Sequence, residues 1–167
     1  METAFFAAGC FWGVQHYMNI APGVISTEVG YMGGHSENPT YKEVKKGNTG
    51  HLETIKVVFD PLVTTYTDLC RLFFEIHDPT QKDGQGIDIG SQYLSAIFYI
   101  SESQLSDAEA VIDILKDKGF DIATTLRPAL STSSDIDQTF FSAEDYHQHY
   151  FEKNDGTPDC HFRVKRF

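Results

Sequence analysis

The chain has 167 residues, of which 41 % are hydrophobic and 22 % are charged, a composition typical of globular rather than disordered proteins. This length suits one domain with a sizeable core and is short for two. The formal net charge is −11 and the only basic cluster is the terminal RVKRF, so we expect no nucleic-acid partner.

Strand-like and helix-like apolar patterns alternate along the chain. The predicted strands are residues 2–8, 24–32, 51–60, 93–100 and 120–130. The predicted helices begin at Phe11 and at about Thr65, lie around residues 105–115, and span 142–153. Loops are expected at 33–50 and 78–91, and an irregular tail from about residue 154. This interleaving predicts a single α+β (two-layer α/β) domain over residues 1–167, with a mixed sheet packed with helices and a long irregular C-terminal segment.

Two of the predicted helices carry capping signals. Thr65 and Asp68 have the spacing of a capping box. Ser142 is a candidate N-cap followed by acidic residues, which favour the positive end of the helix dipole.

The cysteine pattern indicates a reducing compartment. Cys10, Cys70 and Cys160 are too few and too scattered for a disulfide framework, and no CxxC pair occurs. The first residues, METAFFAAG, lack the basic region of a signal peptide, and no run of 18 apolar residues could span a membrane. We therefore expect a cytoplasmic protein with no membrane contact.

The stretch FAAGCFWGV places Cys10 after a strand and a glycine, at the start of a predicted helix. Unpaired backbone N–H groups and the positive end of the helix dipole would stabilise a thiolate there. A cysteine is also a small apolar side chain that usually packs in a core, and the pattern alone leaves both readings open. Phe11 and Trp12 are either core aromatics or, beside a reactive thiol, a clamp for an apolar group.

Glu53 shares one face of its predicted strand with Ile55, Val57 and Phe59. Burial of a carboxyl group among such side chains raises its pKa and keeps it protonated, which suits a general acid. The alternative is a carboxylate at the strand end that turns back to solvent or pairs with His51.

The remaining candidates are less specific. Asp88 lies in a glycine-rich loop, where turn chemistry is the default role for aspartate. Tyr41 and Tyr93 could supply hydroxyl groups to a site or could simply pack. Cys70 flanks the apolar stripe of its helix and is predicted to be buried and inert. Cys160 lies in a polar tail and is either a partner for another cysteine or a free thiol.

The histidines near the C-terminus deserve a test as metal ligands. His147 and His149 are two positions apart and diverge on a helix, so His147, His149, Cys160 and His161 are not expected to form a zinc site. We expect neither a metal nor an organic cofactor.

Seven motifs, in this order, resemble those of the methionine sulfoxide reductase A family. They are GCFWG at 9–13, GYMGG at 30–34, NPTYKEV at 38–44, TGHLETI at 49–55, HDPT at 77–80, QGIDIGSQYLSAIFY at 85–99 and EDYHQHY at 144–150. The resemblance implies a peptide-methionine (S)-S-oxide reductase that acts on oxidised proteins or peptides, and on free methionine sulfoxide. Such an enzyme repairs oxidised proteins with thioredoxin as reductant; we expect a monomer.

The resemblance also implies roles for individual residues. Cys10 would attack the sulfoxide sulfur and become a sulfenic acid. Glu53, helped by Tyr41 and Tyr93, would hydrogen-bond the sulfoxide oxygen and supply a proton. Phe11 and Trp12 would hold the S-methyl group, and Asp88 would help to fix the site.

Two departures from the family pattern concern the loop and the tail. The family loop reads QGNDxGxQYRS, whereas Ile87 and Leu94 stand here in place of Asn and Arg, so its hydrogen bonding is expected to differ. The chain ends NDGTPDCHFRVKRF, without the glycine-rich tail of many relatives. Cys160 is then the candidate resolving thiol, which would form a disulfide with Cys10 that thioredoxin reduces.

Other functions compete with this interpretation. A thiol peroxidase would reduce hydrogen peroxide and leave sulfoxides untouched. A cysteine amidohydrolase would need a histidine to activate Cys10, for which His16 is the local candidate. An inactive relative would bind oxidised methionine without turnover.

Overall fold

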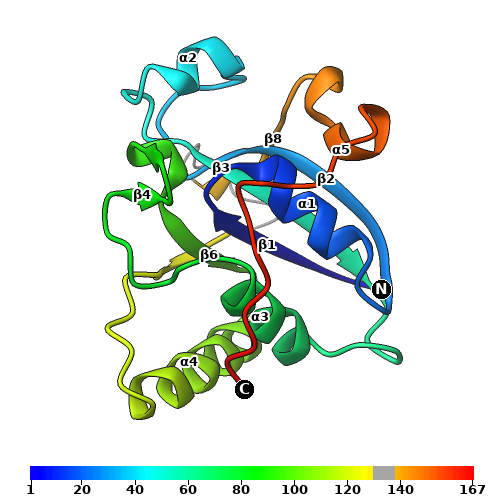
Figure 1. Cartoon of the computed structure of the whole chain (residues 1–167), viewed down its shortest axis with the longest axis vertical. Helices are drawn as coiled ribbons and strands as arrows, with labels where there is room; N and C mark the ends of the chain where they lie inside the picture. The colour runs from blue at the N-terminus through cyan, green and yellow to red at the C-terminus, as the bar shows by residue number, and fades with distance from the viewer. Residues whose placement is uncertain (130–137) are drawn as a thin grey trace.

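The computed structural model describes residues 1–129 and 138–167, which form a six-stranded mixed sheet packed with helices. The strands are β1 (Glu2–Ala8), β2 (Val24–Met32), β3 (Leu52–Phe59), β4 (Gly84–Gln85), β5 (Asp88–Ile89), β6 (Ser95–Tyr99), β7 (Thr125–Pro128) and β8 (Phe141–Ser142). The main sheet has the order β7-β6-β1-β3-β2-β8, and β4 and β5 form a separate hairpin. All neighbours in the main sheet are antiparallel except β6 and β7 (Figure 1). The predicted fold class is confirmed.

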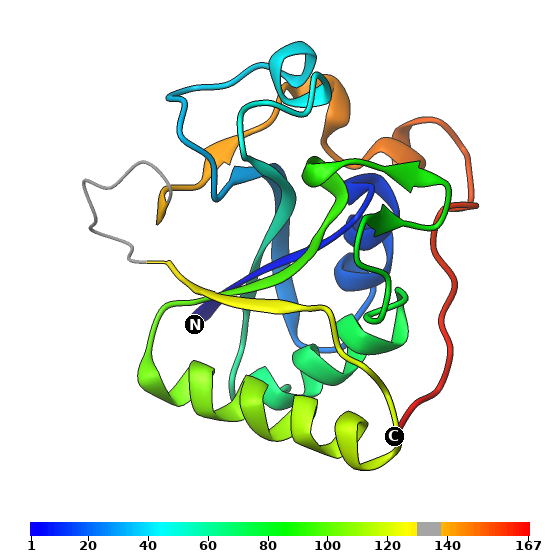
Figure 2. The same ribbon diagram turned by 90° about the vertical axis from the view of Figure 1, so that its left-hand side faces the viewer.

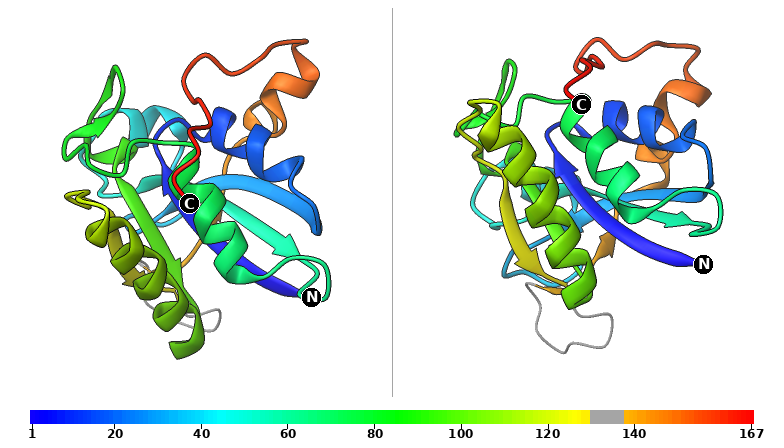
Figure 3. Two further views of the ribbon diagram at one scale, coloured as in Figure 1. Left: turned by 60° about the horizontal axis from the view of Figure 1, so that its bottom comes forward. Right: turned by 90° about the horizontal axis from the view of Figure 1, so that it is seen from below.

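The helices are α1 (Phe11–Asn19), α2 (Tyr41–Lys45), α3 (Tyr66–Glu75), α4 (Glu102–Asp117) and α5 (Tyr150–Lys153). Three of them cover one face of the sheet: α1 packs on β2 and β3, α3 on β1, and α4 on β6. Seen from below, α3 and α4 lie side by side along that face (Figure 3). The main hydrophobic core is buried between these helices and the sheet. A smaller core, which includes Met32, Leu52 and Phe98, lies apart from it.

The capping box predicted at Thr65 is confirmed. The Thr65 hydroxyl accepts a hydrogen bond from the backbone N–H of Asp68 (3.0 Å), and the Asp68 carboxylate accepts one from the N–H of Thr65 (3.2 Å).

Two predicted loops contain regular structure. The loop over 33–50 holds α2, which begins with a second capping box between Thr40 and Glu43. The loop over 78–91 contains the β4–β5 hairpin. A hydrogen bond from the N–H of Gly86 to the Gln81 side chain (2.7 Å) fixes the turn of this hairpin. The strand predicted over 120–130 is regular only in β7, and residue 130 lies outside the described residues.

The helix predicted over 142–153 is wrong for most of its length. Ser142 is no N-cap: it lies in β8 and pairs with Gly30 of β2. A short 3₁₀ turn follows, and only Tyr150–Lys153 is α-helical, after His149 in a left-handed conformation. The physical reason is that Gln148 hydrogen-bonds both the N–H and the C=O of Val29 (2.8 Å each), so this segment is held against β2.

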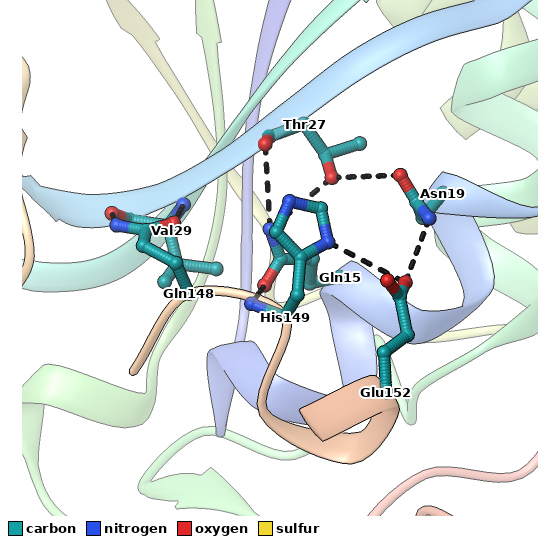
Figure 4. Close-up of polar contacts among 7 residues, drawn as sticks. All are labelled: Gln15, Asn19, Thr27, Val29, Gln148, His149 and Glu152. Atoms are coloured by element: carbon teal, nitrogen blue, oxygen red, sulfur yellow. Dashed lines mark hydrogen bonds and ion pairs between the residues drawn. The ribbon is translucent and has the colours of Figure 1, made fainter. Parts of the chain in front are cut away.

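Further hydrogen bonds join this segment to α1 (Figure 4). Gln15 is buried, donates to Thr27 and accepts from the N–H of His149 (2.7 Å). Asn19, at the end of α1, donates to Glu152 of α5 (2.7 Å). The network fixes α5 against the middle and the end of α1, the helix whose first turn carries the candidate site.

Residues 154–167 form an irregular segment along the outside of α1 and α3 (Figures 1 and 2). The Tyr17 hydroxyl donates to the carbonyl of His161, and the N–H of Val164 donates to the carbonyl of Glu75 (2.7 Å). Arg166 donates to the carbonyl of Phe74 (2.8 Å). The tail has no helix or strand, and individual side-chain and backbone hydrogen bonds hold it against the domain.

In the part of the chain that the structure describes, no helix is long and apolar enough to cross a membrane.

Candidate active site

Cys10 is the N-cap residue of α1, directly after the end of β1. The turn passes through Gly9, whose φ of +86° is accessible to glycine and strained for other residues. A Cβ at Gly9 would also lie 2.6 Å from the Cβ of Gln85. The predicted position of Cys10, at a strand end and a helix start, is confirmed.

Glu53 lies on β3, opposite Tyr31 of β2, and is only 3 % exposed. Its carboxylate accepts a hydrogen bond of 3.1 Å from the backbone N–H of Phe11, in the first turn of α1. Burial and the nearby Cys10 and Asp88 raise the pKa of Glu53 well above its ordinary value, although the Phe11 hydrogen bond acts the other way. The raised pKa favours the protonated carboxyl group. The alternative of a solvated strand-end carboxylate is wrong, because the side chain is buried.

Seven predicted site residues line one cavity of about 140 Å³. They are Cys10, Phe11, Trp12, Tyr41, Glu53, Asp88 and Tyr93. They come from α1 and its N-cap, from α2, β3 and β5, and from the 3₁₀ turn before β6. Residues separated by more than 80 positions thus meet around one thiol.

The tyrosines of this cavity are neutral phenols. Burial and the nearby Glu53 raise the pKa of both Tyr41 and Tyr93. Tyr41 is positioned through its backbone, because its N–H donates to Glu144 (3.0 Å), which also accepts from the hydroxyl of buried Tyr31 (2.9 Å). Both phenols keep an O–H that can donate to an oxygen atom in the cavity.

Trp12 is held by two residues of the C-terminal third of the chain. Its indole N–H donates to Nδ1 of His147 (3.0 Å), and Tyr150 stacks on its ring with centroids 3.7 Å apart and planes 4° apart. His147 also contacts Phe11 and Tyr41 edge to face or tilted. These contacts fix the aromatic wall beside Cys10.

Cys160 does not line the 140 Å³ cavity and approaches Cys10 from another side. A second cavity of about 780 Å³ is lined by Cys10, Trp12, Asp88, Cys160 and His161 among others. Cys10, Trp12 and Asp88 are common to both cavities, so Cys10 lies where the two meet.

Cys10 and Cys160 lie close enough for each to shift the pKa of the other. The Cys10 thiol donates to the Cys160 sulfur, which raises the pKa of Cys10, as does burial; the backbone N–H of Trp12 opposes both effects. The same hydrogen bond lowers the pKa of Cys160. The sequence predicted that the helix start would stabilise a Cys10 thiolate. In the free protein this effect is outweighed, and Cys10 is a thiol.

The other sulfur and histidine predictions have clear outcomes. Cys70 is fully buried in the main core, and burial raises its pKa to about 12, as expected for an inert thiol. Among residues 1–129 and 138–167, no cluster of three or more His, Cys, Asp or Glu side chains could hold a metal ion.

The supporting roles of Glu144, His147 and His161 were not predicted from the sequence. Glu144 and His147 occur in the EDYHQHY motif, but their partners Tyr41 and Trp12 are more than 100 positions away, so spacing gave no signal. His161 directly follows Cys160, and a histidine beside a candidate nucleophile was a signal that could have been used.

Comparisons with known proteins agree with this geometry. The family model described as "Peptide methionine sulfoxide reductase" matches residues 2–167. The chain is 48 % identical over 153 residues to the peptide methionine sulfoxide reductase MsrA of Methanothermobacter thermautotrophicus, covering 92 % of this chain and 88 % of that protein.

Solved structures of Mxr1 also resemble this chain in fold. The reduced form of Mxr1 from Saccharomyces cerevisiae superimposes with a TM-score of 0.85 at 33 % identity, covering 99 % of this chain and 92 % of that one. Mxr1 in complex with Trx2 shares the fold, with a TM-score of 0.60 at 24 % identity over 97 % of this chain and 88 % of that one. The chain thus belongs to the methionine sulfoxide reductase A family and is a thiol-dependent peptide-methionine (S)-S-oxide reductase.

Proposed function

We propose that Cys10 is the nucleophile that attacks the sulfur of methionine sulfoxide in the 140 Å³ cavity. The observation that carries this proposal is the meeting of Cys10 with buried Glu53, whose pKa is raised by that burial, in that one cavity. Glu53 gives its proton to the sulfoxide oxygen as the Cys10 sulfur attacks, and the proton of the Cys10 thiol replaces it. The protonated oxygen then moves from the substrate sulfur to the Cys10 sulfur while the transient bond between the two sulfur atoms breaks. Methionine leaves, and Cys10 is a sulfenic acid.

The other lining residues bind the substrate. Tyr41 and Tyr93 donate hydrogen bonds to the sulfoxide oxygen, where negative charge is concentrated. Phe11 and Trp12 form the apolar side that takes the S-methyl group. Asp88 lies in both cavities, and its negative charge contributes to the raised pKa of Glu53.

We propose that Cys160 resolves the sulfenic acid. Two observations support this: both cysteines line the 780 Å³ cavity, and each shifts the pKa of the other. The resulting disulfide would be reduced by thioredoxin, a proposal supported by the solved complex of the relative Mxr1 with Trx2. We propose further that the protein is cytoplasmic, and that residues 1–167 form one catalytic domain that acts as a monomer without a cofactor. The three free cysteines support the reducing compartment.

The test of the nucleophile is a stereospecific assay of Cys10→Ser on the two methionine sulfoxide epimers, with dithiothreitol as reductant. We expect the parent to reduce only the S epimer and Cys10→Ser to reduce neither. Cys70→Ala, which removes a thiol that lines neither cavity, should keep the parent activity. Substantial turnover by Cys10→Ser would contradict the mechanism, and fast reduction of hydrogen peroxide without sulfoxide reduction would favour a peroxidase.

The test of the resolving thiol is mass spectrometry after one turnover without reductant. We expect a Cys10–Cys160 disulfide in the parent and a Cys10 sulfenic acid in Cys160→Ser. A sulfenic acid on Cys10 beside a free Cys160 in the parent would instead mean that an external thiol recycles the enzyme.

A further inference from the structure

His161 is buried in the tail directly beside Cys160, with 2 % of its surface exposed. Its Nδ1 lies 3.2 Å from the Cys160 sulfur, and its Nε2 lies 2.6 Å from the carbonyl oxygen of Ala8 at the end of β1. Each ring nitrogen therefore has one partner, and one of these partners is a thiol.

The Ala8 carbonyl determines which nitrogen carries the proton. A carbonyl oxygen only accepts hydrogen bonds, so Nε2 must be the N–H donor. Burial lowers the pKa of His161, so the ring is neutral at pH 7 and Nδ1 keeps a free lone pair directed at Cys160. This is the tautomer required for Nδ1 to accept the Cys160 proton.

Close packing fixes the ring in this position. A Cβ at Gly13 of α1 would overlap the His161 ring and lie 2.8 Å from the Cys160 sulfur, so the second glycine of GCFWG leaves the space that Cys160 and His161 occupy.

The titratable groups around the ring, besides Cys160, are Cys10, Asp88 and His77. The negative charge of Asp88 favours an imidazolium, which would stabilise the ring after it has accepted a proton.

The chemistry of recycling requires such a base. In the reduced protein the Cys10 S–H donates to Cys160 and lowers the pKa of Cys160. Once Cys10 is a sulfenic acid, that S–H is gone. The Cys160 sulfur then keeps its own backbone N–H and Nδ1 of His161 as partners, and of these only Nδ1 can accept a proton.

We propose that His161 is the general base that deprotonates Cys160 for its attack on the Cys10 sulfenic acid. This inference rests on the proposed roles of Cys10 and Cys160. Nδ1 takes the Cys160 proton, the thiolate attacks the Cys10 sulfur, and the S–O bond of Cys10 breaks as the S–S bond forms. The hydroxide that leaves takes up the proton held by His161, so that the products are one disulfide and one water.

The experiment compares His161→Gln with the parent in single turnovers without reductant. The glutamine amide can keep the hydrogen bond to Ala8 but offers no base to Cys160. Methionine release reports the first step, and loss of the dimedone-reactive sulfenic acid together with disulfide gain reports the second. We expect methionine release at the parent rate and disulfide formation about 100-fold slower at pH 7, the usual size of general-base catalysis. His35→Gln, at an exposed histidine before α2, should match the parent in both steps.

The pH profile separates a base from a merely structural residue. In His161→Gln, disulfide formation should rise with pH as Cys160 ionises unaided, and should approach the parent rate in alkaline solution. A displaced Cys160 would instead slow the step by one factor at every pH, and that result would overturn the proposal. Disulfide formation at the parent rate at pH 7 would overturn it too, whereas absence of methionine release in the parent would overturn the proposed function itself.

Discussion

Cys10 has two sides that are built differently. On the substrate side, Glu53 is held by a central strand, with β2 on one edge and β1 on the other. On the recycling side, Cys160 and His161 lie in a segment without helix or strand, held by hydrogen bonds to β1, α1 and α3. The acid of the first step is part of the core, whereas the second thiol is attached to the surface of the core.

This difference suits the two steps. A carboxyl group with a raised pKa needs a buried, rigid environment, and the sheet provides it for Glu53. A disulfide that a protein reductant must reach has to be accessible, and both Cys10 and Cys160 are partly exposed. Substitutions in the tail should therefore slow only disulfide formation. Substitutions that disturb β3 should stop sulfoxide reduction itself.

The largest expected effect after loss of Cys10 comes from Glu53→Gln. Glutamine can donate a hydrogen bond to the sulfoxide oxygen but cannot transfer a proton, so methionine release should slow by about 10²- to 10⁴-fold. Rapid-quench measurement of methionine release checks this, with Glu109→Gln on the exposed face of α4 as control. Release at the parent rate would make Glu53 a structural residue.

Gly13→Ala should separate the two sides of Cys10. The new methyl group would overlap His161 and displace the tail, while the cavity that holds Glu53 has no contribution from Gly13. We expect disulfide formation to slow by about 10- to 100-fold, the usual penalty for misplaced reacting groups, with methionine release largely kept. Equal slowing of both steps, measured in one single-turnover experiment, would show that the two sides are not independent.

The sequence predicted the substrate side well, for a physical reason. Strand alternation placed Glu53 on the buried face, and a strand followed by Gly9 placed Cys10 at a helix start; both signals are local. The capping box at Thr40 and Glu43 was equally local, and it predicts α2, which the loop assignment over 33–50 had left out.

The C-terminal part could not be predicted in the same way. Its conformation depends on side chains that reach distant backbone groups, such as Gln148 to Val29 and His161 to Ala8. The pattern over 142–153 is helical in period, yet these long-range bonds hold most of the segment in another conformation. The contact between Cys160 and Cys10 is of this kind, and only the family resemblance pointed to it.

Glu53 should also lower the stability of the fold at neutral pH. Its pKa is raised in the folded protein, so between the ordinary carboxyl pKa and the folded value the unfolded chain has lost a proton that the folded protein keeps. Stability contributed by this group is therefore present at acid pH and is lost as pH rises through that window. Glu53→Gln should raise the melting temperature at pH 7 relative to the parent, and the gain should shrink toward pH 4; a lower melting temperature at pH 7 would contradict it.

The smallest expected effect concerns an anchor of the tail. Arg163 donates to Glu75 at the end of α3 (2.8 Å), and the Arg163 side chain is 60 % exposed. The Glu75 side chain is only 8 % exposed, so Arg163→Ala leaves a buried carboxylate without this partner and should cost about 1–3 kcal/mol in global stability. Yet Arg163 lies three positions after Cys160, so disulfide formation should slow by roughly two- to fivefold through local loosening of the tail. Lys82→Ala, which breaks the exposed pair with Asp121, is the matched control and should leave the rate unchanged. Equal rates in the two variants would mean that the contacts of His161 alone hold Cys160 against Cys10.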